Sequence, residues 1–242
     1  LQSLPVHRVG LMSEGHIAVA ADEGVDLTHA AAKVAARCCG GGQWANPENS
    51  LAQEYNIKLA REVSEMGFDE IQLDYIRYSD GPGKIGGDYE GRSEVISKFV
   101  ERVKHAIGPQ VVLSADVYGR TLWEWNSRNI DPIGQNLDYL EKSLDVLSPM
   151  IYPSHYQNPD LVYNPKKLVK LAMDKGKERL DVQLRPFIQG LSSAMPRGMD
   201  LVTYIQEELR ALESHKESGF LVWNPSSNYD SLWNAIEGLE NN

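Results

Sequence analysis

Two aspartates, Asp74 and Asp116, are the first candidates for chemistry because they occupy equivalent places in two segments of similar pattern. Along residues 71–76, apolar side chains alternate with Gln72 and Asp74. Along residues 111–117, the same alternation leaves Asp116 on the more polar face. Each aspartate therefore stands near the end of a predicted strand. Two carboxyl groups placed in this way could share acid–base work, one donating a proton while the other stays ionised.

Each aspartate also has a purely structural interpretation, as a helix cap or as a buried carboxylate bonded to the backbone or to Arg77. An open doubly wound sheet, covered by helices on both faces, would bury these acids at a cost. A closed barrel points the inward residues near its carboxyl-terminal rim into the mouth of an active site. Two equivalent acids on consecutive strands favour the barrel and the catalytic interpretation.

The later predicted strand ends are rich in polar and aromatic residues, which is typical of a sugar-binding rim. Trp and Tyr rings stack on sugar faces, and Asn, Gln and His side chains bond hydroxyl groups. In the alternative interpretation, Trp223 plugs the barrel core and Tyr152 is a wall residue. The candidate binding residues are Gln72, Arg77, Tyr118, Tyr152, His155, Gln189, Trp223 and Asn224.

The elements that must position these residues alternate regularly between strand and helix from Asn46 onward. Asn46 is expected to cap the first helix, Asp200 a later one, and Ser93 to open the second. Before residue 44, a strand over 16–21 and a helix over 28–37 are the only expected elements. The expected strands cover 68–77, 110–117, 144–152, 180–189 and 219–223. The expected helices cover 47–66, 93–107, 133–143, 165–175, 201–212 and 229–239.

Strict alternation predicts an α/β fold with a parallel sheet and helices outside it. The chain has 242 residues, 42% of them apolar and 24% charged, which fits a globular protein with a substantial core. Its formal net charge of −10 argues against nucleic acid or an anionic membrane as a partner. No apolar run reaches the roughly 18 residues of a membrane-spanning helix, and no signal peptide is visible.

Several other motifs point to no cofactor and no metal. The run Gly81–Gly86 matches G-x-G-x-x-G, but the next expected helix begins too far downstream for a dinucleotide site. The six histidines lack metal-ligand spacing. The adjacent Cys38 and Cys39 exclude a disulfide scaffold.

The run Gly67–Tyr78, with Trp44–Pro47 before it, resembles a family of bacterial glycoside-hydrolase domains. Segments 113–119, 148–152 and 185–190 and the Trp223 strand are similar to that family in the same order. The resemblance implies a (β/α)₈ TIM-type barrel, remotely related to amylase- and chitinase-type barrels. It makes the Asp74 strand the fourth of the barrel and the Trp223 strand the eighth. Serine replaces the usual proline at Ser79.

The resemblance covers about residues 44–229, so we divide the chain into an atypical segment, 1–43, and a barrel portion, 44–242. Strands four to eight are clear, and strands one to three are expected to be largely missing. The expected partner is a carbohydrate, and the oligomeric state stays open. An extracellular or cell-envelope location is suggested by the resemblance alone.

We expect a glycoside hydrolase that acts on a polysaccharide or oligosaccharide through Asp74 and Asp116. Asp74 is expected to be the nucleophile or stabiliser, because Arg77 could keep it ionised. Asp116 is expected to be the acid, with Glu124 as its substitute. One alternative is a sugar-binding barrel without catalysis. Another is an aldolase- or isomerase-type barrel for phosphorylated substrates, although a phosphate cradle is poorly represented.

Overall fold

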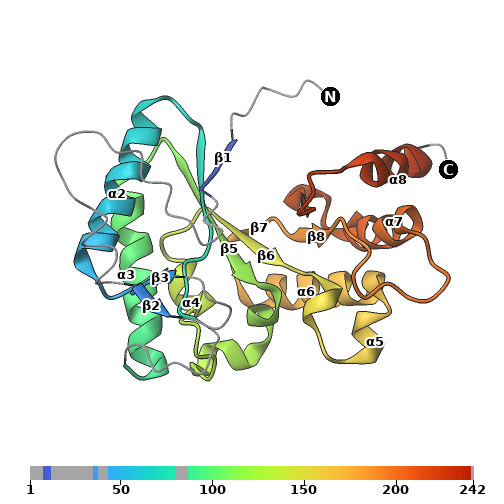
Figure 1. Cartoon of the computed structure of the whole chain (residues 1–242), viewed down its shortest axis with the longest axis horizontal. Helices are drawn as coiled ribbons and strands as arrows, with labels where there is room; N and C mark the ends of the chain where they lie inside the picture. The colour runs from blue at the N-terminus through green and yellow to red at the C-terminus, as the bar shows by residue number, and fades with distance from the viewer. Residues whose placement is uncertain (1–7, 12–34, 38–42, 80–86, 241–242) are drawn as a thin grey trace. The chain divides into compact units, whose positions relative to one another are not determined.

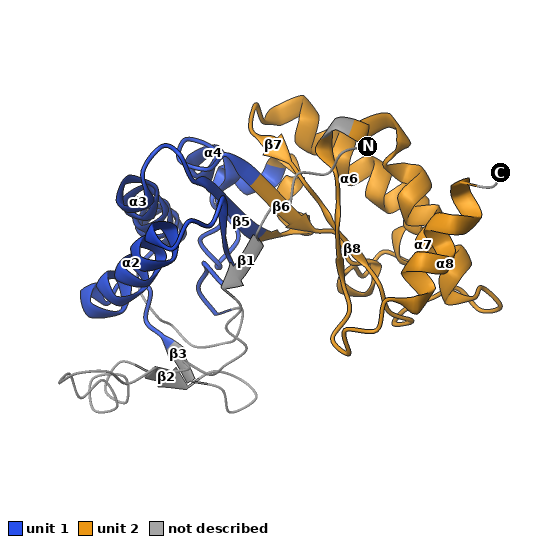
Figure 2. Ribbon diagram, turned by 90° about the horizontal axis from the view of Figure 1, so that it is seen from above, with its two compact units in different colours: residues 1–116, 125–146 blue, residues 117–124, 147–242 orange. Residues whose placement is uncertain are grey.

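The structure is a computed structural model that describes residues 8–11, 35–37, 43–79 and 87–240 (Figure 1). The chain forms two compact units, coloured separately in Figure 2. Unit 1 comprises residues 1–116 and 125–146, as far as they are described, and unit 2 comprises residues 117–124 and 147–242. Each unit contains parallel strands flanked by helices, so the predicted α/β class is confirmed.

In unit 1, three strands lie in the order β1-β4-β5 and run parallel. The helices α2 and α3 pack against each other beside them (Figure 1). A short antiparallel pair, β2 and β3, precedes α2. The strands are β1 (Arg8–Leu11), β2 (Ala35–Arg37), β3 (Gln43–Ala45), β4 (Glu70–Leu73) and β5 (Val112–Tyr118), whose last two residues belong to unit 2. The helices are α2 (Ser50–Glu65), α3 (Tyr89–Ile107), α4 (Leu137–Leu140) and the 3₁₀ turn η2 (Glu124–Arg128).

In unit 2, strand β8 lies between β6 and β9 in parallel pairing, and β7 also pairs with β6. The helix α7 packs against both α6 and α8. The strands are β6 (Val146–Met150), β7 (Gln183–Leu184), β8 (Phe187–Gln189) and β9 (Leu221–Trp223). The helices are α5 (Pro159–Val162), α6 (Pro165–Arg179), α7 (Leu201–Ala211) and α8 (Asp230–Glu240). Short 3₁₀ segments are η1 (Gly119–Leu122), η3 (Pro153–His155) and η4 (Glu213–Ser218).

Apolar side chains at helical and strand spacing form the core of each unit. In unit 1, Ile57, Ala60 and Val63 of α2 are buried, as are Ile96, Val100 and Val103 of α3 and Ile71, Leu73, Leu113 and Ala115 of the strands. In unit 2, the buried set includes Leu147, Leu168, Ala172, Met173, Ile188 and Ile205. Burying these faces fixes the strands, whose carboxyl ends carry the candidate residues.

Two helix starts differ from the sequence-based expectation. Asn49, not Asn46, caps α2, and its side chain accepts a hydrogen bond from the Ala52 amide at 3.0 Å. Asn46 instead forms a turn, in which its carbonyl accepts the Asn49 amide at 2.9 Å. Helix α3 begins at Tyr89 rather than at Ser93, because the Asp88 side chain caps its first turn. The expected cap at Asp200 is confirmed.

Three expected strands or helices are shorter or divided. The expected strand 68–77 ends at Leu73, and Tyr75 beyond it has a φ of +55°, which no continuing strand allows. The expected strand 180–189 is divided into β7 and β8 around Arg185-Pro186, because proline supplies no amide hydrogen. The expected helix 133–143 shrinks to α4.

Before Trp44, the structure differs from the expected elements where residues are described. Strand β1 at residues 8–11 was not expected, yet it pairs with β4 in register. Residues 35–37 form β2, so the end of the expected helix 28–37 is wrong. The rest of that helix, the expected strand 16–21 and the glycine run 81–86 with its expected loop lie outside the described residues.

Candidate active site

The register of β4 and β5 brings the two candidate aspartates to one edge. Leu73 lies opposite Ala115, and this is the last paired position in the register. The next residue along each strand direction is Asp74 after Leu73 and Asp116 after Ala115. Asp74 begins the turn after β4, whereas Asp116 continues β5, and the two strands are neighbours about 4.8 Å apart. Both aspartates thus follow the last paired positions of β4 and β5.

Polar side chains also link β4 and β5, starting on the amino-terminal side of these aspartates. The Ser114 hydroxyl donates to Glu70 Oε1 at 2.6 Å, and both side chains are buried. One step further along, Gln72 Nε2 donates to Asp116 Oδ1. Asp116 is only 7% exposed, and its backbone carbonyl accepts from Gln135 Nε2 at 3.1 Å. These bonds hold the Asp116 carboxyl group in one position and give Gln72 an orienting role.

Asp74 lies in a tight turn immediately after β4. Its Oδ1 atom accepts a hydrogen bond from the Tyr75 amide at 2.6 Å. Burial raises the pKa of Asp74 above its usual value, although the Tyr75 amide and the positive charge of Arg77 act in the opposite direction. Burial outweighs the guanidinium, so the Asp74 carboxyl group retains its proton more strongly than a free aspartate.

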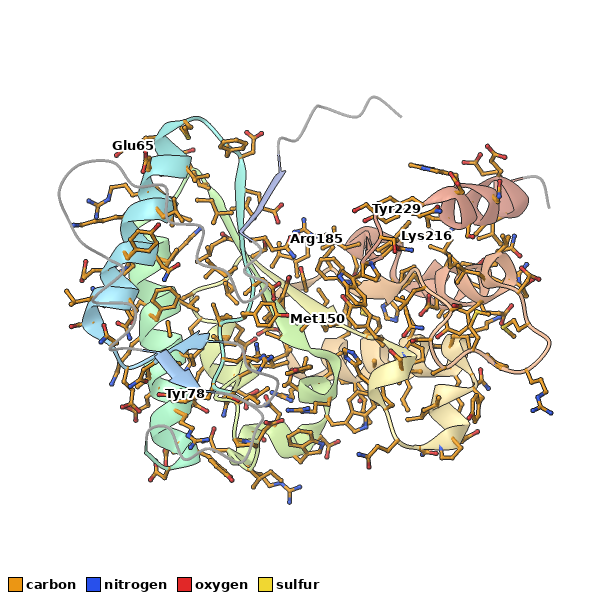
Figure 3. The ribbon with its side chains drawn as sticks, in the orientation of Figure 1. Glu65, Tyr78, Met150, Arg185, Lys216 and Tyr229 are labelled. Carbon is orange, nitrogen blue, oxygen red and sulfur yellow. The ribbon has the colours of Figure 1, made fainter. Side chains whose placement is uncertain are left out.

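The segment after this turn is anchored in the core of unit 1. Tyr78 is 1% exposed, and its backbone amide donates to the Ile133 carbonyl at 2.7 Å. Figure 3 labels its side chain. Its hydroxyl donates to Glu48 at 3.1 Å. Arg77 Nη1 donates to the Tyr78 carbonyl at 3.1 Å. The conformation of the Asp74–Arg77 turn is thus fixed from its carboxyl-terminal side.

A cluster of rings in unit 2 contains four of the expected binding residues. Tyr152 and Trp223 stack with their centroids 5.3 Å apart and an angle of 25°. His155 meets Tyr152 edge-on at 5.2 Å and Tyr118 edge-on at 6.3 Å. Arg120 lies over the Tyr118 ring, 4.4 Å from its centroid. Burial, helped by the charge of Arg120, lowers the pKa of His155, so the imidazole favours its neutral form.

Two other expected binding residues are engaged within unit 2. Gln189 is fully buried, and its Oε1 accepts the Ser154 amide at 3.1 Å. Its Nε2 donates to the carbonyls of Leu191 at 3.0 Å and Ser193 at 2.6 Å. Asn224 Nδ2 donates to the Gly190 carbonyl at 2.7 Å. Both amides therefore hold the loops around the ring cluster.

Glu124, the expected substitute acid, has an exposed environment. Its side chain is 87% exposed and lies 3.7 Å from Lys175 Nζ. Across the described ranges, no group of three His, Cys, Asp or Glu side chains could hold a metal ion. No helix in those ranges is long and apolar enough to cross a membrane.

Four residues near these sites were not predicted from the sequence as site residues: Glu70, Tyr75, Arg120 and Gln135. Glu70 could have been found, because it continues the alternation of Gln72 and Asp74 toward the start of β4. Gln135 lies in an irregular segment 19 residues after Asp116, and no periodic signal connects the two. Tyr75 was expected on the apolar face, where a continuing strand would have put it.

Comparison with solved structures identifies the fold as that of TIM-type barrels. The glycoside hydrolase domain of PgaB (BpsB) from Bordetella bronchiseptica has a TM-score of 0.59 and 14% identity, over 85% of this chain and 65% of that one. The spore cortex-lytic enzyme SleL from Bacillus cereus has a TM-score of 0.57 and 12% identity, over 95% and 58%. A chitinase from Rhizomucor miehei has a TM-score of 0.54 and 14% identity, over 80% and 76%. The chain thus spans less than two thirds of the first and second of these structures.

Residues 8–229 match the family described as "Putative glycosyl hydrolase domain", and the chain belongs to that family. The predicted resemblance to a family of glycoside-hydrolase domains is thereby confirmed. The match begins at residue 8 rather than near Trp44, so it includes most of the segment that the sequence analysis set apart. No curated protein matches the chain.

Proposed function

We propose that this chain hydrolyses glycosidic bonds and that Asp74 and Asp116 are its catalytic carboxyl groups. The register of β4 and β5 carries the proposal, since the two aspartates directly follow the paired residues Leu73 and Ala115. Hydrolysis of a glycoside needs one carboxyl group to protonate the leaving oxygen and another to act as nucleophile or base. The family membership supports the same reaction on a carbohydrate substrate.

The surroundings of the two carboxyl groups favour Asp74 as the acid, which reverses the roles expected from the sequence. Burial raises the pKa of Asp74, and a raised pKa keeps a proton available for donation. Asp116 accepts a hydrogen bond from Gln72 Nε2, which orients its carboxyl group. Asp116 is then the nucleophile or base.

The ring cluster of unit 2 supports a carbohydrate as the ligand. Trp223, Tyr118 and His155 are each at least partly exposed, so each retains surface for contact. Aromatic rings bind the C–H faces of sugars, and the neutral imidazole of His155 can bond a hydroxyl group as donor or acceptor. Tyr152, only 4% exposed, acts mainly by supporting Trp223 from behind. We assign Gln189 and Asn224 to loop positioning rather than to sugar contact.

The proposal is tested by substituting each aspartate and measuring oligosaccharide hydrolysis. Asp74→Asn and Asp116→Asn should each lower kcat by about 100-fold or more, the usual contribution of acid–base assistance. Release of reducing ends from soluble glucans, chitin oligosaccharides and galactans measures the effect. Glu124→Gln is the matched control and should retain activity.

Near-full activity in both aspartate variants would overturn the assignment. A wild-type chain that binds oligosaccharides and cleaves none of them would favour a sugar-binding barrel without catalysis. Thermal unfolding of each variant separates loss of chemistry from loss of fold.

A further inference from the structure

Tyr75, next to Asp74, has an unusual backbone conformation. Its φ is +55°, in the left-handed region that glycine adopts easily and a bulky side chain adopts rarely. Among the described residues, four that are not glycine have a positive φ, and Tyr75 is the aromatic one. Strained residues of this kind cluster at functional sites, where the surrounding structure maintains them.

Hydrogen bonds on both sides of Tyr75 maintain this conformation. Its amide donates to Asp74 Oδ1 at 2.6 Å, and its carbonyl accepts the Arg77 amide at 2.8 Å. The anchored Tyr78 follows directly. The turn therefore ties the orientation of Tyr75 to the position of the Asp74 carboxyl group.

The side chain of Tyr75 gains little from core packing. The residue is 39% exposed, in contrast to Ile71, Leu73 and Ile76 around it, which are buried. The guanidinium of Arg77 lies over the ring, 5.3 Å from its centroid, and so covers one face of it. Glycine would form the same turn without strain, so the turn alone does not account for a tyrosine here.

We propose that the Tyr75 ring is a stacking surface for a pyranose ring of the substrate, immediately beside Asp74. Arg77 supports the ring from one face, and the exposed part of the ring receives the apolar C–H face of the sugar. Substrate contact at Tyr75 then positions the glycosidic oxygen near the carboxyl group that follows β4. This inference rests on the proposed function, because it takes Asp74 as part of the catalytic pair.

Binding is measured by titration calorimetry with soluble tetrasaccharides of β-linked glucose and β-linked N-acetylglucosamine. The parent protein carries Asp116→Asn, so that turnover does not disturb the measurement. Tyr75→Ala and Tyr75→Gly should each weaken binding by about tenfold, as expected for loss of an aromatic anchor. Tyr75→Phe should bind within about twofold of the parent, because the ring face is retained.

Tyr89→Ala is the matched control, because Tyr89 is 42% exposed and also carries an arginine, Arg92, over its ring at 5.4 Å. It should bind like the parent. Tyr75→Gly should unfold at a higher temperature than Tyr75→Ala, since both lose the ring but glycine alone removes the strain.

Unchanged affinity in a folded Tyr75→Ala variant would overturn the inference. So would equal losses in Tyr75→Phe and Tyr75→Ala, and so would failure of the parent to bind either tetrasaccharide. These outcomes are distinct from failure of the proposed function, which the hydrolysis rates of Asp74→Asn and Asp116→Asn in otherwise wild-type protein decide.

Discussion

At the scale of single residues, a buried carboxyl group, Asp116, and a half-buried one, Asp74, differ in their hydrogen-bond donors and neighbours. Asp116 receives the Gln72 amide group, whereas Asp74 has its pKa raised by burial despite the nearby Arg77. Such a difference is what allows one carboxyl group to donate a proton while its neighbour stays ionised. The types of these residues could be read from the sequence, but their roles depended on burial, which it does not disclose.

A third carboxyl group, Glu208 of α7, gives a prediction about stability. It is fully buried, its Oε1 accepts the Gln189 amide at 3.3 Å, and its Oε2 has no hydrogen-bond partner among the described residues. Burial raises the pKa of Glu208 well above 4.5, so the folded state holds this proton more tightly than the unfolded state. The resulting stability is present below about pH 4.5 and is lost as the pH rises toward the folded-state pKa.

Glu208→Gln cannot ionise and keeps an oxygen for the Gln189 amide. The melting temperature of the variant should therefore rise relative to that of the wild type as the pH increases from about 4.5 to 8. Thermal unfolding monitored by circular dichroism across this range measures the gap. A gap that does not change with pH would show that Glu208 does not titrate in this way.

At the scale of elements, α2 shows how local competition decides where a helix begins. Asn46 and Asn49 are both good N-cap residues, and Pro47 after Asn46 fits the first helical position. In the structure, residues 46–49 form a turn and Asn49 takes the cap. Helix periodicity predicted the existence of α2, α3, α6, α7 and α8, because long amphipathic segments carry that signal.

Substituting the two asparagines separately tests this cap. Asn49→Ala should destabilise the protein by about 1 kcal/mol, the usual cost of losing an N-cap. Asn46→Ala should cost less, since its side chain accepts only the Glu48 amide at 3.0 Å in an exposed turn. Urea unfolding measures both free energies, and a larger loss at Asn46 would contradict the assignment of the cap.

The strand ends were harder to predict because contacts distant in sequence fix them. Apolar and polar residues continue to alternate through Ile76, but β4 ends at Leu73 because the backbone turns at Tyr75. The pairing of β1 with β4 joins residues about sixty positions apart, and residues 8–11 carry no strong strand pattern of their own. The division of residues 1–43 from 44–242 stays a prediction.

At the scale of the whole molecule, the candidate residues lie at the carboxyl ends of the strands of a barrel-type fold. TIM-type barrels hold their active sites at that end, on loops that follow the strands. The binding candidates of unit 2 lie at or just after the ends of β5, β6, β8 and β9. Asp74 follows β4, and Asp116 lies within β5. The periodicity of the sequence predicts strand ends at these residues. The internal hydrogen bonds of Gln189 and Asn224 can be seen only in the structure.

The central claim is that Asp74 protonates the leaving oxygen while Asp116 acts as nucleophile or base. Hydrolysis of an unactivated oligosaccharide and of the matching nitrophenyl glycoside, whose leaving group needs no proton, tests it most directly. Asp74→Asn should lose about 100-fold or more on the oligosaccharide but less than about tenfold on the nitrophenyl glycoside. Asp116→Asn should lose about 100-fold or more on both. The reverse pattern would contradict the roles, and full activity of both variants on both substrates would contradict the pair itself.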